Sequence, residues 1–186
     1  MLTPVALPAE TFAVPHGWDN FFVMAGTAAA TLMGLLFVAI TLGAHLSASR
    51  AARGVHVFMT PTLMRFGGVL FQSLALLVPW PSPWPLAIIL ILAGLTGIIY
   101  AIVILRLLRR MDFANIDLRD SIVYGGAPAL ANASLTAGGI GLVIGHPFAP
   151  YAIGGAMALL LGVGIHNAWD MTLWILRNPH PDEPAS

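Results

Sequence analysis

The sequence predicts an all-α integral membrane protein: one domain in which five transmembrane helices form a bundle, with the N-terminus outside the cell and the C-terminus inside. Hydrophobic residues make up 58% of the 186 residues and charged residues only 9%, whereas about a quarter of the residues in a soluble domain are charged. Five apolar stretches are long enough to cross a membrane, which takes roughly 20 residues. All the arginines fall on one side of these stretches, as expected for cytoplasmic connections.

The first two predicted spans each begin with a helix-starting signal. The first covers about 21–44, and Asp19 is placed to accept hydrogen bonds from the free N–H groups at its start. The second covers about 61–78. Thr60 and Pro61 have the pattern of an N-cap followed by a first helical position, where the missing N–H of proline costs nothing.

Prolines and glycines separate the remaining spans, which cover about 86–108, 121–145 and 151–176. The run PWPSPWP at 79–85 predicts a tight turn, because proline cannot donate a hydrogen bond inside a helix. Gly145 and Pro147 close the fourth span. Residues 1–17 are too polar and too rich in proline for a cleaved signal peptide. We expect them to form an outer tail, with a disordered cytoplasmic tail after span five.

The orientation follows from the arginines, because the chain has no lysine. The arginines lie in or beside the connections one–two and three–four, near the start of span two, or after span five: Arg50, Arg53, Arg65, Arg106, Arg109, Arg110, Arg119 and Arg177. The connections at 79–85 and 146–150 contain none. These two connections are therefore predicted to lie outside, where Trp18, Trp80 and Tyr151 fall at the boundary depth that aromatic rings prefer.

Small residues at a spacing of four predict close contacts between helices. Gly26, Ala30 and Gly34 form one such face on span one, and Gly97 lies on another on span three. Small faces let helix backbones approach closely where lipid is as apolar as the side chains. We expect these faces to hold the chain's own helices together. Five helices offer more small faces than one bundle needs, so association with further copies or with other membrane subunits is also expected.

The fifth span carries two polar residues on one face, His166 and Asp170, which are four positions apart. A charged Asp at the centre of a membrane helix costs about 2.5 to 3.5 kcal/mol, so it should face protein or water. Counted from the predicted helix ends, Asp170 lies roughly 8 to 9 Å deep and Arg65 of span two roughly 6 Å deep. This similarity in depth predicts an ion pair between Arg65 and Asp170.

Further polar residues fall near the middle of their spans, notably Gln72 and Asn132, at a depth that His166 shares. Two interpretations remain open. In the first, an ion pair fixes the register of two helices and the other polar groups bond to neighbouring backbone. In the second, Arg65, Gln72, Asn132, His166 and Asp170 line a path for ions or protons, since histidine can carry protons near neutral pH.

The residue types argue against several other functions. There is no cysteine, no pair of histidines at metal-binding spacing and no catalytic motif of the Walker, nucleophile-elbow or H-E-x-x-H type. We therefore expect no metal, no cofactor and no enzymatic activity. A net charge of zero gives no indication of nucleic-acid binding.

The segment WDNFFVMAGTAAATLMGLLFVAITL at 18–42 resembles the opening of small bacterial membrane proteins that carry no assigned function. The shared residues are Trp18, Phe21 and Phe22, the run Ala28 to Ala30, and Gly34 to Val38. The resemblance implies a location in the bacterial inner membrane and implies no activity.

Two functions follow from these observations as hypotheses. The first is an accessory or structural subunit of a membrane assembly, consistent with the small size and the small-residue faces. The second is a homo-oligomeric ion or proton channel or transporter that uses His166, Asp170 and Arg65. A membrane-embedded enzyme acting on lipid would need a catalytic cluster that the sequence does not contain. In either case the lipid bilayer is one partner.

Overall fold

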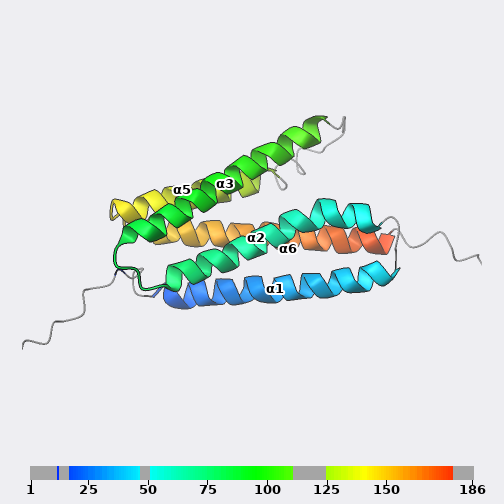
Figure 1. Ribbon diagram of the computed structural model, residues 1–186, viewed down its shortest axis with the longest axis horizontal. Helices are drawn as coiled ribbons and strands as arrows, with labels where there is room; N and C mark the ends of the chain where they lie inside the picture. Colours follow the sequence, from blue (N-terminus) through cyan, green and yellow to red (C-terminus); the bar gives the residue numbers. More distant parts are fainter. Residues whose placement is uncertain (1–11, 13–16, 47–50, 111–124, 178–186) are drawn as a thin grey trace, which may run out of the picture.

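The computed structural model describes Phe12 and residues 17–46, 51–110 and 125–177, which form five helices (Figure 1). They are α1 (Asp19–Leu46), α2 (Ala51–Leu77), α3 (Pro83–Arg110), α5 (Ala127–Val143) and α6 (Ala149–Arg177). The prediction of an all-helical chain is confirmed within these ranges, which contain no β-strand. Three stretches are long and apolar enough to cross a membrane, namely Asp19–Ala39, Pro83–Val103 and Ala149–Asp170, while α5 is a shorter apolar helix.

Successive helices run in opposite directions, so that the bundle has two distinct ends (Figure 1). We call one the tryptophan end, because it holds Trp18 before α1 and Trp80 in the turn between α2 and α3. The other is the arginine end, where α3 finishes at Arg110 and α6 at Arg177. α1, α3 and α6 run from the tryptophan end to the arginine end, and α2 and α5 run back.

The helices form two hairpins that α6 joins. α1 packs against α2, and α3 packs against α5, whereas α2 and α3 make only a slight contact. α6 packs against α5, α2 and α1. Figure 1 shows α3 moving away from α2 and α6 as it approaches the arginine end. All five helices therefore come together only in the half of the bundle near the tryptophan end.

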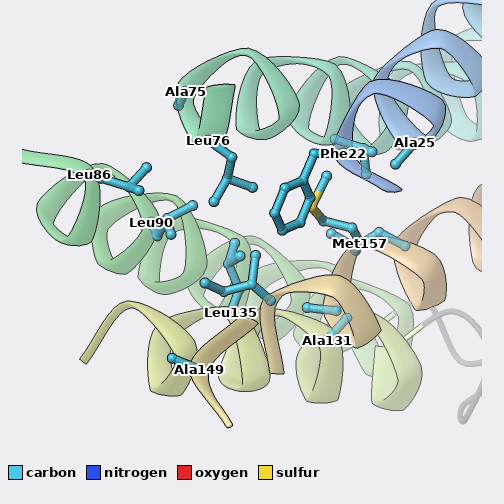
Figure 2. Close-up of a cluster of buried hydrophobic side chains, with 14 of the residues drawn as sticks. Phe22, Ala25, Ala75, Leu76, Leu86, Leu90, Ala131, Leu135, Ala149 and Met157 are labelled. Carbon is cyan, nitrogen blue, oxygen red and sulfur yellow. The ribbon is translucent and has the colours of Figure 1, made fainter. Parts of the chain in front are cut away.

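The apolar core lies in this tryptophan half and receives one large side chain from every helix (Figure 2). These side chains, each at most 3% exposed, are Phe22, Leu76, Leu90, Leu135 and Met157. They point toward one another between the helices. Burial of a side chain of this size stabilises a fold by about 1.5 to 3 kcal/mol in water. In a membrane, the gain comes from close packing, because lipid is itself apolar.

Glycines let α5 lie very close to both of its neighbours. A Cβ atom on Gly139 would come within 2.9 Å of Ile91 on α3, and one on Gly138 within 2.5 Å of Ile153 on α6. Real Cβ atoms are essentially never found at such distances from other side chains. The two adjacent glycines thus face opposite partners, and α5 is held between α3 and α6.

The connection between α5 and α6 is a tight turn with a physical requirement for glycine. Gly145 has a φ of +68°, a conformation that glycine adopts without steric cost. The N–H of His146 donates to Gly141 O at 2.8 Å, and the N–H of Gly145 donates to Leu142 O at 3.3 Å. These bonds satisfy the free carbonyls at the end of α5 in the pattern of a Schellman motif.

Two predicted helix starts are wrong. α2 begins at Ala51, so Pro61 lies inside the helix instead of at its first position. α3 begins at Pro83, so the predicted turn at 79–85 is shorter than expected. Proline is tolerated in a first helical turn because the N–H groups there have no partner within the helix. This tolerance allows Pro83 and Pro85 to be helical.

The other helices lie close to the predicted spans. α1 and α6 each extend the predicted ranges by one or two residues at either end. α5 covers 127–143 of the predicted 121–145, and positions 121–124 lie outside the described residues. Pro128 occupies the first turn of α5, with Gly126 as the N-cap. The expected tails at 1–11, 13–16 and 178–186 also lie outside the described residues.

Candidate functional site

The structure brings together His166 and Asp170, which the sequence places on one face of α6. His166 Nε2 lies 3.3 Å from Asp170 Oδ2, so the predicted i, i+4 arrangement is confirmed. The two side chains are 40% and 38% exposed. Their neighbours Ile165 and Trp169 are large apolar side chains that are 50% and 63% exposed. A polar pair therefore lies at the edge of an exposed apolar surface of α6, between Ile165 and Trp169 on one side and the buried Val163 and Asn167 on the other.

The position of Asp170 explains why this pair is only half covered. Asp170 follows Ala152 by 18 residues, which is about five helical turns, so both point in the same direction. At Ala152 that side of α6 meets α5, whose Ser134 Oγ donates to Ala152 O at 2.9 Å. Gly138 of α5 lies against Ala149 and Ile153. The start of α5 at Ala127 is therefore roughly 16 Å nearer the arginine end, still short of Asp170.

Arg65 lies near the same height as this pair, on the neighbouring helix α2. A Cβ atom on Gly164 of α6 would come within 2.5 Å of Phe66, which fixes the register of the two antiparallel helices. The half-buried Arg65 is thus level with His166, and Asp170 lies about one helical turn further toward the arginine end. Because α2 begins at Ala51, Arg65 is roughly 20 Å from its start, not the 6 Å expected. Its pairing with Asp170 stays a prediction.

Two buried amides on α2 and α6 hold oxygen atoms without a hydrogen bond in the described part of the chain. They are Gln72 Oε1 and Asn167 Oδ1, on side chains that are 3% and 4% exposed. Such atoms normally find a donor, because burying an acceptor without one costs about 1 to 3 kcal/mol. Water is the smallest donor that could serve them. Like Gln72, Asn167 buries an amide oxygen that has no hydrogen bond in the described part of the chain, but Asn167 is not among the predicted site residues.

Asn132 does not join this group. Its Nδ2 donates to Pro128 O at 2.7 Å within α5, and its side chain packs directly against Gly97 of α3. The face of α5 that meets α6 is a different one, formed by Ser134 and Gly138. Within one chain Asn132 therefore does not meet His166, because Asn132 is directed at α3, and its bond to Pro128 O corresponds to the interpretation in which polar groups bond to neighbouring backbone.

The predicted packing residues also separate into two groups. A Cβ atom on Gly26 would come within 2.8 Å of Ser73 on α2, and Gly97 meets Asn132. Ala30 and Gly34, in contrast, are exposed, and no atom lies within 4 Å of a Cβ placed on Gly34. Further along α1, the contact with α2 is made by Met33, which lies 3.6 Å from a Cβ placed on Gly67. On α1 the spacing of four therefore identified one contact and missed the direction of the face.

The described residues offer no metal-binding cluster, and a hollow on the surface of α1 is apolar. The described residues contain no group of three or more His, Asp or Glu side chains that could hold a metal ion. A shallow hollow of about 520 Å³ lies on α1, lined by Met24, Thr27, Ala28, Thr31 and Leu32. The hydroxyl groups of its two threonines donate to carbonyls of their own helix at 2.8 and 2.9 Å. The hollow therefore presents an apolar surface.

Comparison of the chain with models of protein families, with curated proteins and with solved structures finds no match in any of the three. The function of the protein is therefore inferred from the geometry of the His166–Asp170 pair and its surroundings.

Proposed function

We propose that this chain is a multi-pass protein of the bacterial inner membrane and acts as an accessory or structural subunit of a membrane assembly. In this proposal all five helices span the bilayer, with the tryptophan end outside and the arginine end in the cytoplasm. The distribution of arginines supports this orientation. Small size and the presence of several outward-facing apolar helices support a role that depends on contacts within the membrane.

The half-exposed His166–Asp170 pair is the observation that carries the proposal. A carboxylate inside a membrane span costs about 2.5 to 3.5 kcal/mol at the helix centre unless protein or water surrounds it. Helices of the same chain cover only part of this pair. A second protein surface on α6 would cover the rest, so the pair is suited to an interface between subunits.

Native mass spectrometry after gentle extraction from the organism's own membranes tests this proposal. We expect a complex of fixed stoichiometry that contains this chain, and we expect Asp170→Leu to release the chain from it. Asp19→Asn is the matched control, because Asp19 lies at the tryptophan end of α1, away from the proposed interface. Detection of the wild-type chain only as a solitary monomer would contradict the proposal.

A homo-oligomeric ion or proton channel is the second candidate. The buried acceptor atoms Gln72 Oε1 and Asn167 Oδ1 favour it, because unpaired polar atoms inside a membrane protein are typical of a hydrated path. In this case His166, Asp170 and Arg65 would line the path with the two amides. In liposomes, His166→Ala and Asp170→Asn would change the flux of protons or cations while the amount of folded protein stays the same. Flux equal to that of empty liposomes would exclude this candidate.

A further inference from the structure

α3 exposes a stripe of large apolar side chains that ends in a positive charge. Leu95, Ile99 and Ile102 are 44%, 63% and 40% exposed, and Arg106 is also exposed. Their spacing of four, three and four residues places all of them on one helix face. The stripe points away from α5, because α3 meets α5 through Gly94 and Gly97.

α6 exposes a face with the opposite character. No atom lies within 4 Å of a Cβ placed on Gly155 or on Gly162, so both positions border open space. The same side of the helix carries Leu159, which is partly buried against the chain's own core, and then the half-exposed His166–Asp170 pair. The positions 155, 159, 162 and 166 repeat the spacing of the α3 stripe. Two glycines, one leucine and the His166–Asp170 pair on α6 thus occupy the spacing that three large apolar residues and a guanidinium group occupy on α3.

The two faces also lie at the same heights along the bundle. Gly139 of α5 lies against Ala87 and Ile91 of α3, and Gly138 lies against Ala149 and Ile153 of α6. Each position on α3 is therefore level with a position about 60 residues later on α6. Counted onward at the same rise per residue, Ile102 comes near the height of Gly162, and Arg106 comes near that of His166. Copies of one membrane protein are related by rotation about the membrane normal, so only groups of equal height can meet between them.

We propose that the α3 stripe of one copy docks on the α6 face of a second copy, with Arg106 beside the His166–Asp170 pair. This inference rests on the proposed function, because it names the subunit that covers the pair. Within one chain the two faces cannot meet, since α5 lies between α3 and α6 and the helices diverge toward the arginine end (Figure 1). The contact is head-to-tail, so repetition of it produces a ring if the rotation closes.

A symmetric contact between two α6 faces is the competing arrangement, and charge argues against it. A two-fold axis along the membrane normal would place each Asp170 opposite the Asp170 of the second copy. Like charges at short distance repel, whereas Arg106 and Asp170 attract one another, more strongly in a medium of low dielectric constant than in water. The head-to-tail contact therefore fits the charges on the two faces better.

Disulfide cross-linking in native membranes tests the contact. Because the sequence has no cysteine, only the introduced cysteines of this chain can form the disulfide. Ile102→Cys and Gly162→Cys are introduced in separate, differently tagged chains, which are then co-expressed and oxidised. We expect a mixed dimer, and a ladder of higher species when both cysteines are in one chain. Neither single variant should cross-link with itself. Leu130→Cys, on the exposed side of α5, is the control position.

Charge reversal gives a second, independent test. Arg106→Asp and Asp170→Arg should each abolish the Ile102–Gly162 cross-link, and the double variant should restore it, because the double variant re-creates an opposite-charge pair. Cross-linking of Gly162→Cys with itself would overturn the proposal in favour of the symmetric contact. A native complex with one copy of this chain and other subunits would also overturn it, yet would leave the assembly role intact.

Discussion

The two halves of the bundle are held together in different ways. Near the tryptophan end, all five helices surround one apolar core, and glycines bring α5 close to both of its neighbours. Near the arginine end, α1, α2 and α6 stay together while α3 diverges (Figure 1). There the buried Asn167 and the half-exposed His166–Asp170 pair lie on α6. The tryptophan half thus holds the apolar core together with the buried Gln72 and Ser73 of α2, and the arginine half holds the half-exposed ionisable pair.

This difference teaches that the large core side chains and the half-exposed His166–Asp170 pair lie at different heights of the bundle. Substitutions in the core should reduce stability. Substitutions at the pair should change assembly or flux if the proposed functions hold. The predictions below compare matched positions in the two halves.

Truncation of a buried phenylalanine should have the largest effect. Phe22 and Phe66 are 0% and 1% exposed, but Phe22 belongs to the core to which all five helices contribute, whereas Phe66 lies outside that core, against Gly164 of α6. We expect Phe22→Ala to lower the free energy of unfolding by about 4 kcal/mol and Phe66→Ala by about 3 kcal/mol, both through the cavity that is left. Unfolding in mixed micelles measures both values. A larger loss for Phe66→Ala would contradict the comparison of the halves.

Replacement of a packed glycine should have the next largest effect. Leucine at Gly139 would force α5 away from Ala87 and Ile91 of α3, and we expect a loss of about 3 kcal/mol. Gly34→Leu is the matched control, because no atom lies within 4 Å of that position. The control should change the free energy of unfolding by less than about 0.5 kcal/mol. Equal losses in the two variants would contradict the close approach of α5 to α3 at Gly139.

Substitution of the two buried asparagines by leucine should change the free energy of unfolding in opposite directions. Asn132 donates to Pro128 O and fits against Gly97, so Asn132→Leu should cost about 2 kcal/mol through a lost hydrogen bond and overpacking. Asn167 buries an oxygen atom that has no partner in the described part of the chain. Asn167→Leu should therefore stabilise the isolated chain by about 1 kcal/mol. Destabilisation by Asn167→Leu would indicate that this oxygen is hydrated or bound.

Removal of one hydrogen bond from the turn at the tryptophan end should change the free energy of unfolding least. Trp80 Nε1 donates to Ala75 O at 2.8 Å and so satisfies a carbonyl near the end of α2. Trp80→Phe should lower the free energy of unfolding by about 1 kcal/mol, the usual net value of one hydrogen bond. The bond from Phe12 N to Trp80 O, at 2.7 Å, uses only backbone atoms and should persist. Thermal unfolding in detergent with circular dichroism checks the size of the change.

The sequence predicts the helices better than it predicts their faces. Apolar length alone places α1, α3 and α6 within three residues of their observed bounds. The start of α2 is missed because Pro61 resembles a helix start and is in fact tolerated ten residues inside the helix. The buried side of each helix is harder to predict, because a membrane helix is apolar all round and its periodicity does not mark the core.

In the candidate site, too, contacts within one helix are predictable from the sequence, whereas contacts between helices are not. The contact between His166 and Asp170 follows from their spacing on one helix and is confirmed. The direction of Asn132 toward α3, and the height of Arg65 beside His166, depend on how the helices pack. Contacts at Gly97 and Gly164 determine both. Nothing in the residues themselves distinguishes these glycines from Gly34, which meets no neighbour.

The position of α6 in the chain has a consequence for biosynthesis. The α1–α2 and α3–α5 pairs consist of helices that follow one another in sequence, so each can form soon after it leaves the ribosome. α6 is the last of the five helices to be made, yet it provides most of the contact between the two pairs. Until its synthesis is complete, the pairs have only slight contacts, of which that between α2 and α3 is the largest. Termination before Ala149 would release a chain that the membrane quality-control proteases encounter as two loosely attached hairpins.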